Sequence, residues 1–381
     1  MQPIIIIGTG LAGYNLAKEI RKLDKNIPLH LITADGGESY SKPMLSNALA
    51  KGKSPAQLVL STAEQMAAQL PATIYTRTRV ESIDPQSRTI NTTSGELQYS
   101  KLVLAVGASQ VEPPLHGDAV DAVYSVNDLD DYAKFREALA AAETIGIIGP
   151  GLIGCEFAND LVAANKQVIV IGPAATPLDR LLPPQVGELL MRELEKAGVN
   201  WRLGVTATEV NKTNSGFQMT LSDGSQLEVD LVLSAVGLQP NLELAKNTGM
   251  EVKRGIVVDR TLQTSFPDIY ALGDCIEIHG LVLPFVLPLM NSARTLAKTL
   301  TGNPTDISYP AMPVIVKTPA HPVVVSPPAV DSEGDWQIDL EDSGARALYR
   351  AKDGSLLGFV LTGDKVAEKP ALSKELPAVL P

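Results

Sequence analysis

Two glycine-rich segments of this chain have the residue types and spacing that bind dinucleotide phosphates. The first runs from Ile4 to Gly13, where a strand of isoleucines leads directly into a GxGxxG pattern. Its glycines, Gly8, Gly10 and Gly13, permit a tight turn, a close approach of backbone to a pyrophosphate, and close packing of a helix on the strand. Free N–H groups at the start of that helix, predicted at 14–23, attract phosphate.

The second segment, Ile145–Gly154, repeats the pattern with Gly149, Gly151 and Gly154, and a helix is predicted after it at 155–165. In an oxidoreductase, two such units predict a flavin dinucleotide and a nicotinamide dinucleotide held face to face. After the first unit, a strand predicted at 29–33 leads to Asp35, where a carboxylate is expected to accept a hydrogen bond from a ribose hydroxyl. The alternative interpretation is that Asp35 is a solvated turn acid.

Composition narrows the class of protein. The chain has 381 residues, of which 45% are hydrophobic and 20% charged, enough for two or three folded domains. A formal net charge of -11 argues against a nucleic-acid partner, because phosphate binding needs a basic surface. The sequence has no apolar run of bilayer length and no basic flank before its first apolar strand, so we expect no membrane insertion and a cytoplasmic location.

The cysteines and histidines show no ligand spacing. Cys155 and Cys275 lie far apart in sequence and form no CxxC pattern, and the four histidines are scattered. We therefore expect neither a metal site nor a local dithiol.

The segment Glu38–Asn47, a polar turn before a short apolar stretch, resembles the flavin-contacting segment of the pyridine-nucleotide-dependent flavoprotein reductases. In that family a basic residue before the proline, here Lys42 before Pro43, lies near the isoalloxazine ring. A solvated loop lysine is the alternative interpretation. The disulphide-reducing branch carries cysteine here, whereas this chain has serines, so the resemblance implies a flavin that passes electrons directly to an acceptor.

Two later segments match further motifs of that family. Asp268–Cys275 is a predicted strand ending in Gly-Asp, and the resemblance implies that Asp274 accepts a hydrogen bond from the ribityl chain. A helix predicted to start at Pro288 and run to Leu300 would point its N-terminus at the reduced flavin. Met290 contacts the flavin in this interpretation and belongs to the core in the alternative.

Two strands that end in small residues, Leu102–Ala108 and Leu231–Asn241, correspond in the family to the crossings between domains. We therefore expect an α/β fold with two Rossmann-like dinucleotide-binding domains, glutathione-reductase-like, plus a small α+β C-terminal domain. The predicted division is an FAD-binding domain at 1–110 and 239–309, an NAD(P)H-binding domain at 111–238, and a partner-docking domain at 310–381. In the last domain we expect an antiparallel sheet of five strands with a helix on one side, the helical tail at 366–376.

The nicotinamide side gives two more expectations. Glu156 fits the family's GxxGxE pattern, which implies a contact with the nicotinamide, while an acid that satisfies the helix dipole is the alternative. The cofactor-selecting position at the end of the strand 168–171 is Gly172, neither acid nor arginine. NADH is therefore favoured over NADPH, unless Arg180 reaches the ribose.

The chain most resembles the rubredoxin-reductase branch of the family, on the segments Lys42–Ser46, Lys317–Pro319 and Val323–Pro328. This implies hydride transfer from NAD(P)H to FAD and two one-electron steps to rubredoxin, in alkane hydroxylation or oxidative-stress electron transport. Flavorubredoxin and ferredoxin reductases are alternatives, and an NADH-responsive flavoprotein sensor is another. An NADH oxidase or peroxidase is disfavoured because no cysteine lies near the flavin segment.

Rubredoxins of this family are small and acidic, so we expect a basic rim at the flavin edge. The rim would be drawn from Lys42, Lys51, Lys53, Arg294, Lys317 and Lys369. The residues that we predict to be catalytic are Glu156, Lys42 and Lys317. The predicted cofactor-binding residues are Gly8, Thr9, Gly10, Leu11, Ala12, Gly13, Asp35, Lys42, Pro43, Val80, Ala105, Gly107, Gly149, Gly151, Leu152, Ile153, Gly154, Glu156, Gly237, Asp274, Pro288, Leu289, Met290 and Lys317.

Overall fold

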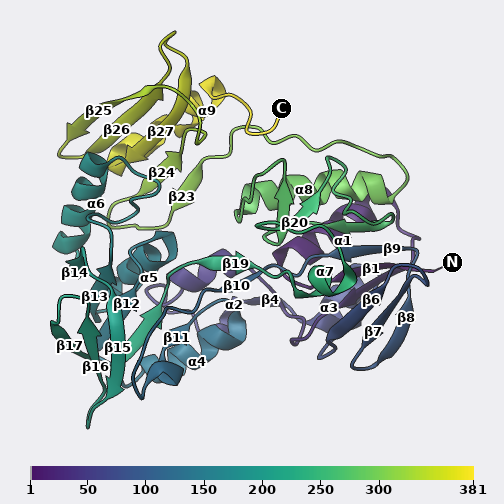
Figure 1. Ribbon diagram of the computed structural model, residues 1–381, viewed down its shortest axis with the longest axis horizontal. Helices are drawn as coiled ribbons and strands as arrows, with labels where there is room; N and C mark the ends of the chain where they lie inside the picture. Colours follow the sequence, from purple (N-terminus) through teal and green to yellow (C-terminus); the bar gives the residue numbers. More distant parts are fainter. Residues whose placement is uncertain (1) are drawn as a thin grey trace.

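Each glycine-rich segment follows the central strand of its own parallel sheet. The computed structural model describes residues 2–381 and arranges them in three lobes (Figure 1). The first sheet has the order β21 (Ile269–Ala271), β9 (Lys101–Leu104), β1 (Ile4–Ile7), β2 (Leu29–Ile32) and β5 (Thr73–Tyr75). Helices α1 (Leu11–Leu23) and α8 (Val286–Leu300) pack side by side in this lobe, which also holds α3 (Ala63–Gln69) and α7 (Glu243–Thr248).

The second lobe repeats this plan. Its sheet has the order β11 (Tyr124–Ser125), β18 (Leu231–Ser234), β12 (Thr144–Ile148), β13 (Gln167–Gly172) and β14 (Val199–Leu203), all parallel. The helices α4 (Leu129–Leu139), α5 (Leu152–Ala163) and α6 (Pro184–Lys196) belong to this lobe. An antiparallel meander of β15 (Ala207–Lys212), β16 (Phe217–Leu221) and β17 (Gln226–Val229) completes it.

Two short strands join the lobes. β10 (Ala108–Gln110) pairs antiparallel with β19 (Leu238–Pro240). The chain therefore enters the second lobe and returns to the first along two neighbouring strands. This is the arrangement predicted for the two crossings, although the domain boundaries stay a prediction. The smaller ladders are β6 (Val80–Asp84), β7 (Thr89–Thr92) and β8 (Gly95–Gln98), then β20 (Ile256–Val258) with β22 (Ile276–Ile278), and β3 (Ser39–Tyr40) with β4 (Val59–Ser61).

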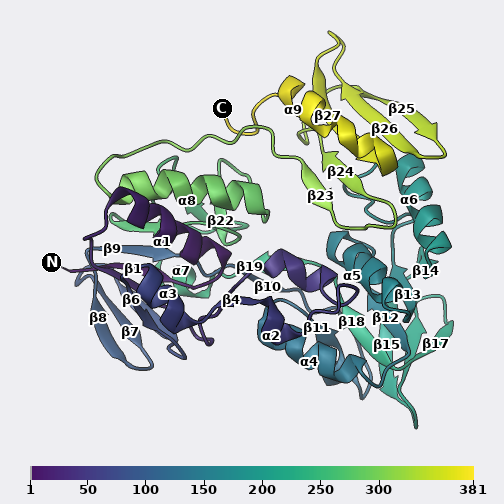
Figure 2. The same ribbon diagram turned by 180° about the vertical axis from the view of Figure 1, so that it is seen from behind.

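The third lobe is an antiparallel sheet with a helix on it, as predicted. Its order is β23 (Val314–Val316), β24 (Val323–Ser326), β27 (Leu356–Thr362), β26 (Gly344–Arg350) and β25 (Asp335–Glu341). The helical tail predicted from 366 begins instead with a 3-10 segment, Gly363–Glu368, and continues as α9 (Lys369–Glu375). Both views place β23 beside the N-terminal end of α8 (Figures 1 and 2).

The second and third lobes share one apolar core. The buried cluster that holds Val168 and Phe157 of the second lobe also holds Val323 and Ala347 of the third. The same cluster includes Leu45, from a 3-10 segment (Lys42–Asn47) that the predicted division assigns to the FAD-binding domain. That segment, together with α2 (Pro55–Leu58), therefore packs against the neighbouring lobe rather than its own sheet.

The third lobe is tied to the first at both of its ends. Tyr309, in the connection from α8, forms a β-bridge with Leu380, with N–H···O distances of 2.7 and 3.0 Å. Leu380 is buried in the core of the first lobe, and the Tyr309 hydroxyl lies 2.8 Å from that of Ser292 on α8. The Arg260 guanidinium donates to backbone carbonyls on both sides of this bridge.

Three helices start earlier than predicted. α1 begins at Leu11 and α5 at Leu152, immediately after the second glycine of each pattern, rather than at Tyr14 and Cys155. α8 begins at Val286, so that the proline expected to open it lies within its first turn. A proline is tolerated there because the backbone N–H groups of a helix's first turn have no acceptor within the helix. Replacing one of them by proline therefore costs no helical hydrogen bond.

Candidate functional site

The two glycine patterns form matching cradles. A side chain at Gly13 would meet the carbonyl oxygen of Gly8 at 1.9 Å, and one at Gly154 would meet that of Gly149 at the same distance. Gly8 and Gly149 both have φ +113, which L side chains rarely adopt. By contrast, nothing lies within 4 Å of a side chain built at Gly10 or Gly151. Each cradle is thus closed where helix meets strand and open where a phosphate would lie, which fits a dinucleotide.

The first cradle adjoins the Gly-Asp turn. Gly273 packs so tightly on Ala12 that an added Cβ would lie 3.0 Å from the Ala12 Cβ, and Gly8 packs on the backbone of Ala105. Thr9 and Ala12 are themselves buried. Predicted cofactor-binding positions from three distant parts of the chain therefore meet at the carboxyl end of the first sheet.

Asp35 is held in its own turn. Its Oδ1 accepts hydrogen bonds from the Thr33 hydroxyl at 2.6 Å and from the Gly37 N–H at 2.8 Å. This arrangement agrees with the alternative interpretation of a turn acid. It also fixes the carboxylate at the end of β2, where it remains exposed. The contact with a ribose stays a prediction.

Lys42 and Asp274 are both half-buried, and their charges act on each other. The Lys42 Nζ donates to Asn127 Oδ1 at 2.5 Å, which joins the first lobe to the second. Burial lowers the pKa of Lys42, and the charges of Asp274 and Asp128 partly oppose this effect. Burial likewise raises the pKa of Asp274, and the Lys42 charge lowers it. The Asp274 carboxylate, whose charge Lys42 partly offsets, is suited to accept a hydrogen bond from a donor on a bound group.

Glu156 is the centre of a junction between all three lobes. It is fully buried on α5, and its Oε1 accepts the Lys317 backbone N–H at 2.9 Å. Its Oε2 accepts the Ser46 hydroxyl at 2.5 Å and forms an ion pair with the Lys317 ammonium. That ammonium also donates to Pro43 O at 2.7 Å. Both carboxylate oxygens therefore have protein partners, and a contact between Glu156 and the nicotinamide stays a prediction.

Two further polar residues of α5, missed in the sequence, extend this junction. The Asp160 carboxylate accepts the backbone N–H groups of Leu49 at 2.9 Å and Ala50 at 3.1 Å. Asn159 Oδ1 accepts the Ala320 N–H at 3.0 Å. The sequence could have indicated this junction, because α5 is apolar except for the side chains at 156, 159 and 160. Buried polar groups such as these need hydrogen-bond partners.

The comparisons with known proteins agree with this geometry. The family model described as pyridine nucleotide-disulphide oxidoreductase matches residues 2–297. The chain belongs to this family. A second model, described as a rubredoxin binding C-terminal domain, matches residues 306–376.

Relatives and solved structures cover the whole chain. Rubredoxin-NAD(+) reductase of Alcanivorax borkumensis is 52% identical over 100% of both chains. Nitric oxide reductase FlRd-NAD(+) reductase of Aeromonas salmonicida is 39% identical over 98% of this chain and 96% of its own. The crystal structure of a ferredoxin reductase from Rhodopseudomonas palustris superposes with a TM-score of 0.89 at 27% identity, covering 99% of this chain and 96% of the other.

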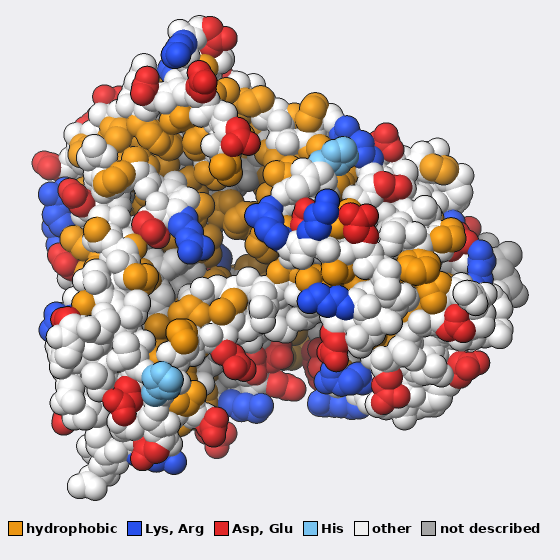
Figure 3. Space-filling model, in the orientation of Figure 1, with side chains coloured by type: hydrophobic (Ala, Val, Ile, Leu, Met, Phe, Trp, Pro, Cys, Tyr) orange, Lys and Arg blue, Asp and Glu red, His pale blue; other side chains and the backbone are white. Residues whose placement is uncertain are grey.

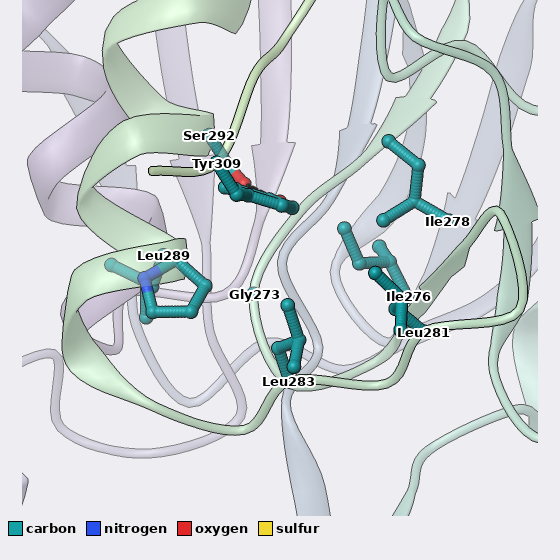
Figure 4. A pocket seen from close by; sticks show the side chains of 9 residues that line it. Gly273, Ile276, Ile278, Leu281, Leu283, Leu289, Ser292 and Tyr309 are labelled. Atoms are coloured by element: carbon teal, nitrogen blue, oxygen red, sulfur yellow. Dashed lines mark hydrogen bonds between the residues drawn. The ribbon is translucent and has the colours of Figure 1, made fainter. Parts of the chain in front are cut away.

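A small apolar cavity adjoins the start of α8 in this oxidoreductase fold. Pro288 and Leu289, both predicted flavin contacts, line it together with Gly273 (Figure 4). One turn further along α8, the Ser292 hydroxyl meets that of Tyr309, from the connection to the third lobe, whereas Ile276, Ile278 and Leu281 line the opposite side. Met290 is half-buried and packs against the core of the first lobe, which supports the core interpretation of that residue.

Near the second cradle, three apolar side chains are exposed. Ile153 on α5 is 39% exposed, Val236 is 38% exposed, and Leu238 of β19 is 38% exposed. Gly237 between them has φ +123 and open space on its Cβ side, as has Gly107 with φ +66. Val80, by contrast, is buried in the core of the first lobe.

The end of β13 has no room for a selecting side chain. A Cβ at Gly172 would lie 2.1 Å from the Pro150 ring, so the proline inside the second cradle requires glycine here. Arg180 lies elsewhere: it lines a surface groove with Pro328 and Trp336 of the third lobe. The position of Arg180 therefore does not favour a contact with the ribose of the nicotinamide dinucleotide.

Thiol chemistry is not available at the flavin motif. Cys275, which follows Asp274, is fully buried, and burial raises its pKa to about 12. Residues 2–381 contain no group of three or more potential metal-binding side chains, and none of their helices is long and apolar enough to cross a membrane.

The predicted basic rim needs correction. Lys42 and Lys317 point inward: Lys42 donates a hydrogen bond to Asn127, and Lys317 neutralises the buried Glu156. Lys51, Lys53 and Arg294 are exposed, whereas Lys369 is half-buried.

Proposed function

We propose that this chain is an FAD-dependent reductase that transfers electrons from NADH to rubredoxin. The observation that carries the proposal is the joining of two dinucleotide cradles to a domain that matches rubredoxin-binding domains. A full-length relative at 52% identity is named rubredoxin-NAD(+) reductase, which supports it. A role in alkane hydroxylation or oxidative-stress electron transport remains part of the proposal.

The first lobe would hold FAD. The open face at Gly10 would meet the pyrophosphate, and Asp35 and Asp274 would accept hydrogen bonds from the ribose and the ribityl chain. When bound, FAD accepts two electrons together from a nicotinamide and releases them one at a time. We propose the same division of domains as above, with the 3-10 segment at Lys42–Asn47 serving both dinucleotide sites.

The chain itself contributes position and electrostatics. The positive end of the α8 dipole, about half an elementary charge, lies at Pro288 and Leu289 and would stabilise negative charge on a flavin bound there. Lys317 is held by Glu156 and Ser46 at the same segment that carries Lys42. The Lys317 ammonium also donates to the carbonyl oxygen of Pro43, so both lysines lie at the segment that would border the flavin.

NADH fits the second cradle better than NADPH. The clash between a residue-172 side chain and Pro150 excludes an arginine at the end of β13, and residues 173–175 are Pro, Ala and Ala. A 2′-phosphate would therefore lack a cation. If saturating NADPH reduced the flavin as fast as saturating NADH, this assignment would be contradicted.

Flavorubredoxin is a second candidate acceptor. The Aeromonas salmonicida relative, which is named nitric oxide reductase FlRd-NAD(+) reductase, supports this candidate. Steady-state reduction of rubredoxin, of a flavorubredoxin's rubredoxin domain and of a plant-type ferredoxin, with NADH saturating, distinguishes these acceptors. We expect rubredoxin to give the highest kcat/KM. Preference for the second protein supports the alternative, and reduction of none of them would favour a sensor.

A further inference from the structure

Asn127 forms hydrogen bonds with three separate parts of the chain. Its Oδ1 accepts a hydrogen bond from the Lys42 ammonium at 2.5 Å, and its Nδ2 donates to the carbonyl oxygen of Ala108 in β10 at 2.9 Å. Its backbone N–H donates to Asp131 Oδ2 on α4 at 3.1 Å. Asn127 belongs to neither glycine pattern of the sequence. This one residue nevertheless links the segment that carries Lys42 to the strand and the helix that lead into the second lobe.

The partners of Asn127 fix the orientation of its side-chain amide. The Ala108 carbonyl can only accept a hydrogen bond, so the amide nitrogen must face β10. The Lys42 ammonium can only donate, so the amide oxygen must face Lys42. Turning the amide over would break both hydrogen bonds at once. Asn127 is therefore a fixed acceptor for the Lys42 ammonium.

The group that holds Lys42 carries no charge. Within residues 2–381, no carboxylate forms an ion pair with its ammonium. Burial lowers the pKa of Lys42, and the charges of Asp274, Asp128 and Asp131 oppose this effect from a greater distance. The space-filling view shows acidic and basic side chains gathered where the first and second lobes meet (Figure 3). A neutral acceptor keeps the ammonium in place and leaves its charge free to act on a neighbouring anion.

Lys42 lies close to the first dinucleotide cradle. Asp274, whose charge acts on Lys42, follows Gly273, and Gly273 packs tightly on Ala12 of that cradle. FAD bound in this cradle would gain negative charge when it is reduced. A cation held at a fixed position nearby stabilises such charge without the cost of reorganisation.

We propose that Asn127 is a positioning residue of the electron-transfer site, which holds the Lys42 ammonium beside the bound flavin without neutralising it and thereby favours flavin reduction. This inference rests on the proposed function, because it takes the first lobe to hold FAD. Aspartate would not serve in the same way, since its carboxylate would neutralise Lys42 and would face the Ala108 carbonyl without a hydrogen to donate.

The test measures the midpoint potential of the bound flavin by anaerobic titration against redox dyes. Asn127→Leu removes the acceptor and should lower the potential by about 30 mV, which is a roughly tenfold shift towards oxidised flavin for a two-electron couple. Asn127→Asp should also lower the potential, because the carboxylate neutralises Lys42. Asn91→Asp adds the same charge at an exposed position of β7. It is the matched control and should leave the potential unchanged, because solvent and salt screen its charge.

A double-mutant cycle separates positioning of Lys42 from a general structural effect. In a Lys42→Met background no ammonium remains to be held, so Asn127→Leu should cause no further shift. A wild-type potential in both Asn127 variants, or a full shift that persists in the Lys42→Met background, would overturn the positioning role and leave the proposed function intact. A wild-type protein that binds no FAD, or whose FAD is not reduced by NADH, would overturn the proposed function instead.

Discussion

Glu156 places a negative charge in the interior of the molecule, and Lys317 of another lobe neutralises it. Glu156→Gln keeps the side-chain shape but leaves Lys317 without its counter-charge. We expect the free energy of unfolding to fall by about 1.5–3 kcal/mol, the contribution of a charged hydrogen bond. Denaturant unfolding of the FAD-loaded protein measures this. Glu193→Gln, which removes an ion pair with the exposed Lys196, is the control and should change stability little.

Asp274 gives a pH dependence of defined sign. Burial raises its pKa in the folded state above the unfolded value, so the folded protein binds the extra proton. Its contribution to stability is therefore greatest below the unfolded pKa and is lost as pH rises through the folded pKa. Asp274→Asn should stabilise the flavin-free protein at neutral pH, with the gain vanishing near pH ~4, the ordinary value for Asp. It should also weaken FAD binding. A variant less stable than wild type at pH 7 would contradict this.

At the level of elements, the glycines of the second cradle divide into two roles that mutation can separate. Gly154→Ala forces a Cβ against the Gly149 carbonyl and should destabilise the second lobe by about 1–3 kcal/mol, as overpacking does. Gly151→Ala adds a Cβ into open space, so folding should be unaffected while the KM for NADH rises about tenfold through loss of backbone approach to phosphate. Thermal unfolding and NADH titration together measure the pair. Equal effects of both variants on stability would contradict this division.

The elements that the sequence predicted well are those specified by local pattern. Both glycine units, the strand before the Gly-Asp turn and the five strands of the third lobe are present because β-branched runs and turn residues determine them locally. The junction around α5 was not foreseen. Its partners, Ser46, Leu49 and Lys317, lie far from Glu156 and Asp160 in sequence, and only the tertiary fold brings them together. For the same reason the inward direction of Lys42 and Lys317 was missed.

For the whole molecule, the bridge between Tyr309 and Leu380 fixes the third lobe to the first. Leu380→Ala removes a buried side chain from the core of the first lobe and should cost about 2–5 kcal/mol. Faster proteolysis within 301–313 should accompany the loss, because the connection would open more often. The neighbouring Val379→Ala, at a position 41% exposed, is the control. Unchanged proteolysis in Leu380→Ala would show that the bridge does not hold the lobes together.

The shared core of the second and third lobes indicates that the rubredoxin-binding domain and the second cradle move as one unit.

Anaerobic stopped-flow mixing tests the central claim most directly. The FAD-loaded protein is first reduced with one equivalent of NADH, and in parallel with NADPH, while the flavin absorbance is followed. It is then mixed with oxidised rubredoxin. We predict rapid bleaching by NADH, slow bleaching by NADPH, and fast reduction of two rubredoxins for each NADH consumed, since a hydride carries two electrons. Bleaching by NADH without electron delivery to rubredoxin, or faster delivery to a plant-type ferredoxin, would contradict the account.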